Sequence, residues 1–233
     1  MIGDSSNSNY YEDNPIQTMD SSTLFSKTFF WMFLGLLGTG LVAAYSYFSG
    51  MLEGLIMGGF FPIIAIIEVV VVLVFSLLFK RLSPTTVGIL YFAYAFINGL
   101  TFSTIFYAYE LSSITYLFVV CALIFGGLAF WGYTAKRDLS RLGTLFTAML
   151  LGGLILSLIN LFLRNSMLDI ILNWVILLVF FGITAYDMNK LKALAQDPEL
   201  DREKIAIYCA MQLYLDFINI FLRILAIFGK RRD

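Results

Sequence analysis

Residues 57–79 read MGGFFPIIAIIEVVVVLVFSLLF, an almost unbroken apolar run that carries a single charged side chain, Glu68. A helix that crosses a bilayer needs about 20 mainly apolar residues, so this run is long enough to span a membrane. Its apolar residues are continuous rather than alternating, which is typical of a membrane helix and not of a barrel strand. The stretch therefore predicts an α-helical membrane protein.

The same pattern recurs along the chain. Six runs are long enough to span a bilayer: 29–48, 57–79, 88–107, 113–133, 144–163 and 169–187. A seventh, 205–228, is apolar but interrupted by Asp216, Asn219 and Arg223. The composition agrees, because only 13% of the 233 residues are charged, against about a quarter in a soluble domain. We expect an all-α polytopic membrane bundle, with six spanning helices around a shorter central seventh.

The distribution of Lys and Arg predicts the orientation, since cytoplasmic loops carry an excess of these residues. With a cytoplasmic N-terminus, the inner side holds ten of them, and the outer loops between spans hold only Arg164. Lys230, Arg231 and Arg232 would break this rule if the seventh segment crossed fully. We therefore expect that segment to enter the membrane, turn and return, which places both termini in the cytoplasm.

The chain then divides into three regions. Residues 1–26 are polar and acidic and predict a disordered cytoplasmic tail, 27–229 form the seven-helix membrane domain, and 230–233 form a basic cytoplasmic tail. The net charge of −1 argues against nucleic-acid binding, which needs a basic surface. The sequence contains no histidine, which excludes histidine-based catalysis and metal ligation.

Charged side chains inside a membrane cost about 2.5–3.5 kcal/mol each on insertion scales, so each is a candidate functional residue. Three carboxylates hold such positions, Glu68, Asp187 and Asp216, and Arg223 is the one intramembrane cation. The ordinary alternative for Asp216 is an ion pair with Arg223, which lies two helical turns further along the same face.

Asp187 and Asp216 are candidates for a proton-sharing pair. If the bundle brings them close, both cannot ionise cheaply, so one keeps a proton and the two titrate as a unit. A protonated pair holds two helices together through a hydrogen bond, whereas a deprotonated pair repels. Its hard oxygen atoms suit transient binding of Ca²⁺. An ordinary ion pair of Asp187 with Lys190 or Lys192 stays open as the alternative.

Other polar residues can support such a switch. A cation from the loop between the second and third spans, Arg81 or Lys80, is a possible latch on the aspartate pair. Possible lining or supporting residues of a cation path are Glu68, Asn98, Asn219 and Arg223. The alternative for these side chains is hydrogen bonding between helices, which is at least as common.

Two stretches carry a resemblance to a known family. Residues 208–225 read YCAMQLYLDFINIFLRIL, and residues 182–187 read GITAYD. Supporting pieces are GYT at 132–134, KRDLS at 136–140 and GLT at 99–101. On these motifs the chain resembles the transmembrane Bax inhibitor motif family, in its bacterial branch, from about residue 28 onward.

The resemblance implies a seven-helix fold with a short central last helix and a cytoplasmic C-terminus, in the plasma membrane of a bacterium. It also implies a pH-sensitive calcium leak, gated by a pair of aspartates that match Asp187 and Asp216. The expected partners are then membrane lipid, Ca²⁺ and protons, with no cofactor and no nucleic acid.

Two other functions compete with a leak. A membrane interaction protein that regulates a stress response or membrane-protein quality control would use the acidic tail over residues 1–26. An intramembrane aspartyl protease needs a Gly-x-Gly-Asp motif, and here Leu213-Tyr214-Leu215-Asp216 has bulky residues in those places. We therefore expect no enzymatic activity.

Overall fold

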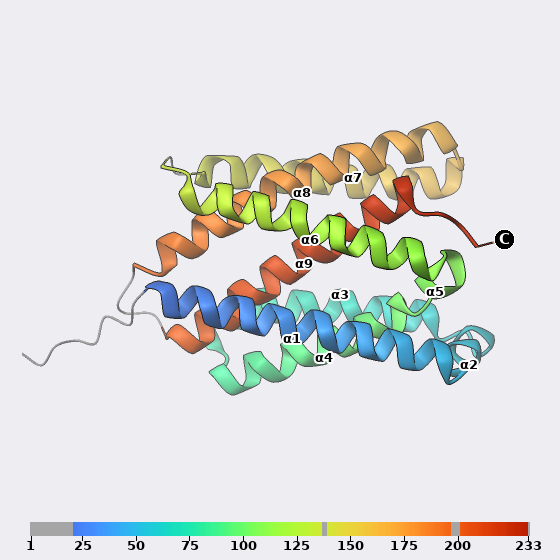
Figure 1. Ribbon diagram of the computed structural model, residues 1–233, viewed down its shortest axis with the longest axis horizontal. Helices are drawn as coiled ribbons and strands as arrows, with labels where there is room; N and C mark the ends of the chain where they lie inside the picture. The colour runs from blue at the N-terminus through green and yellow to red at the C-terminus, as the bar shows by residue number, and fades with distance from the viewer. Residues whose placement is uncertain (1–20, 137–138, 197–200, 233) are drawn as a thin grey trace, which may run out of the picture.

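The computed structural model describes residues 21–136, 139–196 and 201–232, with the side chains of all of these except Ser21, Lys80, Ser140 and Arg141. Its elements are α1 (Ser21–Phe48), α2 (Met51–Met57), α3 (Phe61–Leu78), the 3-10 turn η1 (Phe79–Arg81), α4 (Pro84–Phe102), α5 (Ile105–Ala108), α6 (Leu111–Thr134), α7 (Ser140–Leu163), α8 (Ser166–Leu194) and α9 (Arg202–Phe228) (Figure 1). Seven helices are long and apolar enough to cross a membrane. The expected all-α membrane bundle is confirmed.

The first spanning helix begins earlier than the sequence predicts. α1 starts at Ser21, so residues 21–26 of the predicted tail are helical. The rest of that tail, residues 1–20, lies outside the described residues.

Polar caps set the starts of several helices. The Ser83 hydroxyl accepts a hydrogen bond from the backbone N–H of Thr86 at 3.2 Å, and Pro84 follows at the first helical position of α4. Asn165 caps α8 by accepting from two backbone N–H groups. Such caps satisfy donors that have no partner inside the helix, so each new span starts at a defined residue.

The spanning helices form two layers of three, with α9 between them. α4 packs on both α1 and α3, whereas α6 and α7 both pack on α8. α9 contacts α1 and α4 of one layer and α6 and α8 of the other, and it crosses between the layers obliquely (Figure 1). The expected ring of six helices around one is therefore incomplete, because α3 packs chiefly on α4 and α7 on α8.

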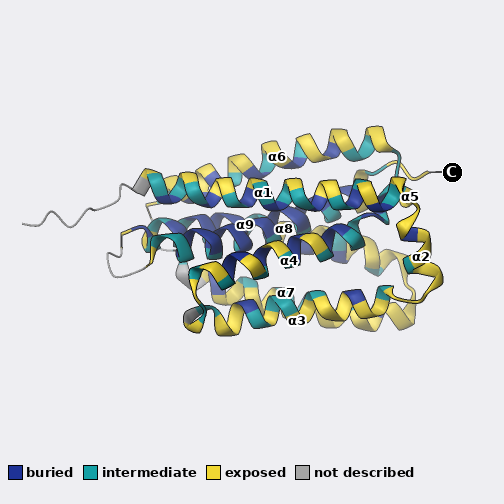
Figure 2. Ribbon diagram, turned by 90° about the horizontal axis from the view of Figure 1, so that it is seen from below, coloured by how far each residue is buried: buried dark blue, intermediate teal, exposed yellow. Residues whose placement is uncertain are grey.

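Burial concentrates in the middle of this arrangement. Figure 2 shows that α9 and the adjoining turns of α8 are mostly buried, while α3 and α7 are largely exposed. Most of the exposed side chains of α3 and α7 are apolar, which suits contact with lipid.

Two expectations for the seventh segment are wrong. α9 is one continuous helix of 27 residues, neither broken nor short, and it crosses from one end of the bundle to the other. The interrupting residues do not break the helix, because the Asn219 amide donates to the Leu215 carbonyl oxygen at 2.8 Å and the backbone ladder continues. The polar side chains of Asn219 and Arg223 form hydrogen bonds while the α9 backbone stays helical.

The C-terminus consequently lies at the end of the bundle opposite to the start of α1, and not beside it (Figure 1). Its positive charges find partners there. Lys230 forms an ion pair with Glu110 at 2.6 Å, and Arg232 donates to the Tyr47 hydroxyl and to the Phe106 carbonyl oxygen. These contacts hold the basic tail at this end of the bundle.

Two glycines allow the closest approaches between helix backbones. A Cβ atom on Gly132 of α6 would lie 2.3 Å from the carbonyl oxygen of Ala185 in α8. One on Gly99 of α4 would lie 2.8 Å from the carbonyl oxygen of Thr39 in α1. No Cβ atom fits at these distances, so a glycine at each position lets the two backbones pack directly. The first contact fixes the turn of α8 that leads to Asp187.

Candidate functional site

A cavity of about 600 Å³ lies between α3, α4, α7, α8 and α9, and we call it the polar groove. Its lining holds three carboxylates and one lysine, namely Glu68, Asp187, Asp216 and Lys190. Uncharged polar groups also line it: Tyr94, Thr147, Tyr186, Gln212 and Asn219. So many polar side chains within the spanning segments are costly in lipid, which makes the groove the candidate functional site.

Asp216 and Asp187 face the groove from two adjacent helices. Asp216 lies near the middle of α9 and is only 3% exposed. Asp187 of α8 is also buried, and it is near enough to Asp216 for the two carboxyl groups to interact electrostatically. The structure therefore places the two predicted aspartates together in one cavity.

The Asp216 carboxyl group is incompletely satisfied. Thr184 of α8 lies beside it, but the Thr184 hydroxyl donates its single hydrogen to the Phe180 carbonyl oxygen at 2.9 Å. The Oδ2 atom of Asp216 is buried without a hydrogen-bond partner in the described part of the chain. Leaving a buried acceptor unpaired costs about 1–3 kcal/mol, so this atom is poised to take a proton, a cation or another donor.

Lys190 is the cation that lines the groove. It follows Asp187 by one helical turn and attracts it electrostatically, without forming a direct ion pair. Its Nζ atom lies 3.4 Å from the Tyr208 hydroxyl and 5.2 Å from the centre of the same ring. Lys192, the other alternative partner of Asp187, donates instead to the Tyr133 carbonyl oxygen at 3.0 Å.

The cations expected to latch or pair with the aspartates lie elsewhere. Arg81 is exposed at the end of η1 and forms no ion pair within the described residues. The Lys80 side chain lies outside the described residues. Arg223 donates to the Asn173 side-chain oxygen of α8 at 2.8 Å, and not to Asp216. Its Nε atom is buried with no hydrogen-bond partner in the described segments.

Glu68 and Asn219 both line the groove. Glu68 extends from α3 and accepts a hydrogen bond from the Thr101 hydroxyl of α4 at 2.7 Å. That bond fixes the Glu68 side chain between the two helices. It also leaves the second carboxylate oxygen of Glu68 available to a ligand in the groove.

Asn98 belongs to a separate buried network that joins α1, α4 and α9. Its side-chain amide donates to the Tyr214 hydroxyl at 2.7 Å, and the Tyr214 and Thr39 hydroxyls lie 2.6 Å apart. Thr39 gives its single hydroxyl hydrogen to the Ala95 carbonyl oxygen at 3.0 Å, so Tyr214 must donate to Thr39. Each hydroxyl in this network has a donor and an acceptor, and Asn98 supports the fold and does not line the groove.

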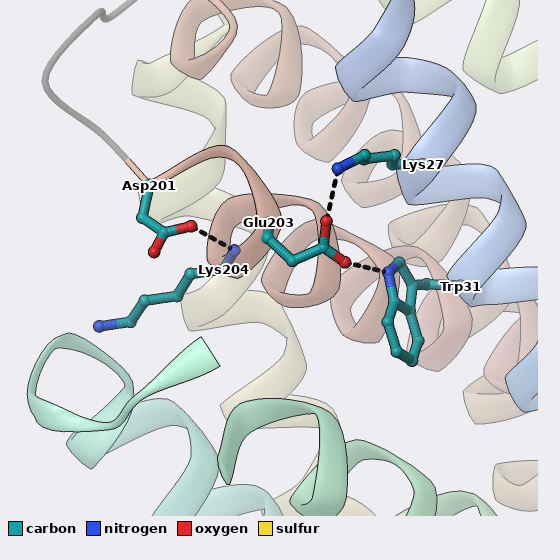
Figure 3. Close-up of polar contacts among 5 residues, drawn as sticks. All are labelled: Lys27, Trp31, Asp201, Glu203 and Lys204. Atoms are coloured by element: carbon teal, nitrogen blue, oxygen red, sulfur yellow. Dashed lines mark hydrogen bonds and ion pairs between the residues drawn. The ribbon is translucent and has the colours of Figure 1, made fainter. Parts of the chain in front are cut away.

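A polar cluster fastens the first turn of α9 to α1 (Figure 3). Glu203 accepts from the Lys27 ammonium at 2.6 Å and from the Trp31 indole N–H at 3.0 Å. Asp201 caps α9 by accepting from the backbone N–H of Lys204 at 3.0 Å. The start of the central helix is thus held by charge-assisted hydrogen bonds at the same end of the bundle as Lys190.

Gln212 lines the groove and Tyr208 contacts its Lys190, although neither is predicted as a site residue from the sequence. They precede Asp216 by four and eight residues, so all three lie on one face of α9, and Asn219 continues that face. The signal was present in the sequence as a polar side chain at each turn of an otherwise apolar helix. These polar side chains share one face only if α9 is a continuous helix, as it is in the structure.

Comparison with known proteins adds a family context. The family model described as "Inhibitor of apoptosis-promoting Bax1" matches residues 21–233, which include both groove aspartates. The chain is 37% identical over 216 residues to the inner membrane protein YbhL of Escherichia coli, with 90% of this chain and 92% of that protein covered.

Two further relatives are uncharacterized proteins. One, from Deinococcus radiodurans, is 36% identical over 222 residues, which cover 93% of this chain and 94% of the relative. The other, from Rickettsia prowazekii, is 35% identical over 211 residues, which cover 89% of each chain. The similarity therefore extends over nearly the whole membrane domain.

Proposed function

The chain belongs to the Bax inhibitor-1-like family of membrane proteins, and on that premise we propose that it is a pH-sensitive cation leak, with Ca²⁺ as the permeant ion. The gate in this proposal is the pair formed by Asp187 and Asp216. The observation that carries it is that both carboxyl groups are buried in one polar cavity without a direct ion pair among the described residues.

Physical chemistry gives the direction of gating. Two close carboxyl groups in a low-dielectric site repel when both are ionised, so they share a proton at lower pH. The shared proton holds α8 and α9 together, and its loss separates them and widens the groove. The leak is then larger at alkaline than at acidic pH.

The charged groups around the pair fit this scheme. Glu68 reaches the groove from α3 and adds negative charge, whereas Lys190 of α8 adds the positive charge. α4, α7 and α9 contribute uncharged polar residues besides Asp216: Tyr94, Thr147, Gln212 and Asn219. Hard oxygen atoms suit Ca²⁺. Among the described residues no three carboxylate or thiol groups cluster closely enough to hold a metal ion, which favours transient passage over a resident site.

The orientation is also part of the proposal. With the C-terminus at the outer end, the loops and tails divide the Lys and Arg residues ten to four in favour of the side that holds the start of α1. The four outer residues are Arg164, Lys230, Arg231 and Arg232. The bias still favours a cytoplasmic N-terminus, and the groove then opens near the cytoplasmic leaflet at Lys190.

Calcium flux from proteoliposomes at acidic and alkaline pH tests the gate. We expect wild-type flux to rise with pH, and Asp216→Asn and Asp187→Asn to flatten that dependence, because an amide has no proton to lose in this range. Asp169→Asn, at the opposite end of α8 and bonded to Asn160, is the matched control and keeps the wild-type profile. Unchanged pH dependence in both groove variants would contradict the proposed gate. An absence of calcium flux in the wild type would favour the alternative of a membrane interaction protein.

A further inference from the structure

The polar groove opens sideways, toward the lipid. Its walls are α3 and α7, and these two helices pack chiefly on α4 and α8. The α3 wall is apolar, with Val69, Val72 and Leu73 lining the groove. Val69 and Leu73 are also more than half exposed, so they meet the bilayer as well as the groove. A molecule that lies in the membrane can therefore reach the groove between the two walls.

The floor of the groove is formed by one face of α9, to which Gln212, Leu215 and Asn219 contribute. Within residues 205–221 of this helix, only these three residues and Tyr208 are half-buried, and they recur every three or four residues. The residues between them are buried against α1, α4, α6 and α8. A laterally open groove thus combines apolar walls with a polar floor, which is the chemistry of an amphiphile binding site.

Charge in the groove selects the headgroup. Asp187, Asp216 and Glu68 supply three carboxyl groups against the single ammonium of Lys190. Asp216 lines this cavity, and its buried Oδ2 atom has no donor within the described residues. A ligand that fits these charges has a cationic group with N–H donors, which can bind the carboxyl groups. It also has a neighbouring anionic group, which can bind Lys190.

We propose that the polar groove binds an aminophospholipid from the surrounding bilayer. The primary ammonium of its headgroup donates to Asp216, its phosphate contacts Lys190, and its acyl chains lie along the apolar walls of α3 and α7. A primary ammonium has three donors, whereas the quaternary ammonium of a choline headgroup has none. The same carboxyl groups would then discriminate between two zwitterionic lipids that differ only in their amine.

This binding site does not depend on the proposed leak. A protein without calcium flux can still bind the lipid, and a leak without lipid selectivity overturns only the lipid site. If both hold, the lipid ammonium competes with Ca²⁺ for the same oxygen atoms.

Native mass spectrometry of the detergent-purified full-length protein tests the proposal, with phosphatidylethanolamine, phosphatidylcholine and phosphatidylglycerol supplied in equal amounts. We expect the phosphatidylethanolamine adduct of the wild type to exceed the phosphatidylcholine adduct by about tenfold, the ratio that one charge-assisted hydrogen bond provides. Asp216→Asn should remove that preference, and Asp169→Asn should keep it.

Two further variants separate recognition from folding. Val69→Trp adds bulk at an exposed wall position and leaves all the carboxyl groups intact, so it should block lateral entry in a stable protein. Lys190→Gln should weaken binding of both zwitterionic lipids, because it removes the contact with their phosphate. Equal phosphatidylethanolamine and phosphatidylcholine adducts in the wild type would overturn the site. So would a preference for phosphatidylglycerol, or a preference that survives both Asp216→Asn and Val69→Trp.

Discussion

α9 and α3 both span the bundle, yet they occupy opposite environments. In α9, 72% of the residues in the most apolar window are buried, although this helix carries Asp216, Asn219 and Arg223. In α3, the most apolar of the seven spans, the share is 11%. Lipid tails are as apolar as leucine, so hydrophobicity does not draw a helix to the centre of a membrane protein. Polar side chains and close packing mark the centre instead.

The largest effect is expected where backbones touch around the centre. Gly132→Val places a side chain against the Ala185 carbonyl of α8, where even a Cβ atom would be 2.3 Å away. We expect a loss of about 3 kcal/mol in the free energy of unfolding, the upper end of the usual cost of overpacking. An SDS titration in mixed micelles measures it.

Gly126→Val in the same helix is the control for that change, because its Cβ atom would meet nothing within 4 Å. Equal destabilisation by the two substitutions would show that helix propensity, and not the contact between α6 and α8, determines the result.

A second pair of substitutions compares the two helices directly. Leu213 of α9 is 1% exposed, whereas Leu73 of α3 is 52% exposed. Leu213→Ala leaves a cavity and should cost about 2 kcal/mol, the low end for such a truncation, because lipid already solvates the reference state. Leu73→Ala should cost far less, since lipid fills the space. Similar midpoints in the SDS titration for both variants would contradict the assignment of α9 to the centre.

The hydrogen-bond network around Tyr214 should contribute less than packing. Tyr214→Phe removes the hydroxyl between Asn98 and Thr39 and leaves both with one partner fewer. We expect a loss of about 0.6–1.7 kcal/mol in the free energy of unfolding, which runs from the average to the largest value measured for such bonds in membranes. Tyr116→Phe on the exposed side of α6 is the control and should leave stability unchanged. The free energies of unfolding of the two variants, measured under one set of conditions, test this prediction. Equal values would contradict a stabilising role of the Tyr214 hydroxyl.

The smallest effect is expected at the start of α9. Glu203→Gln keeps an acceptor for Trp31 but removes the ion pair with Lys27, whose partners are both more than a third exposed. Exposed ion pairs contribute about 0.2–1 kcal/mol and weaken with salt. The melting temperature should therefore fall slightly at low salt and match the wild type at high salt. A large fall that salt does not change would show that this contact anchors α9.

Much of the architecture follows from sequence because lipid imposes one simple rule. Every span must satisfy its own backbone and present apolar side chains, so seven runs give seven helices. The path of the last helix does not follow, because the loop-charge rule describes a bias over all the loops and does not fix the course of one segment. In the structure the tail after α9 is held by Glu110, which lies 120 positions before its partner Lys230. A count of charges does not reveal such a contact between distant loops.

The candidate site, too, follows from the sequence only in part. Position alone singles out Asp187 and Asp216, because a carboxyl group in an apolar run is rare. Which cation lies beside them depends on packing, and here Lys190 lines the groove while Arg81 is exposed. Glycine spacing misleads for a similar reason. Gly54 and Gly58 have the GxxxG spacing typical of packed helices, yet a Cβ atom on Gly54 would meet nothing within 4 Å, whereas one on Gly132 would lie 2.3 Å from the Ala185 carbonyl oxygen.

The oblique course of α9 between the two layers has a consequence for biosynthesis. α9 is the last of the seven spans to leave the ribosome, yet it contacts helices of both layers. The most buried span is therefore the last to be translated. Until α9 inserts, α1 and α4 on one side and α6 and α8 on the other lack their shared partner. Insertion of a single late helix completes the protein, and it delivers Asp216 to Asp187 in the same step.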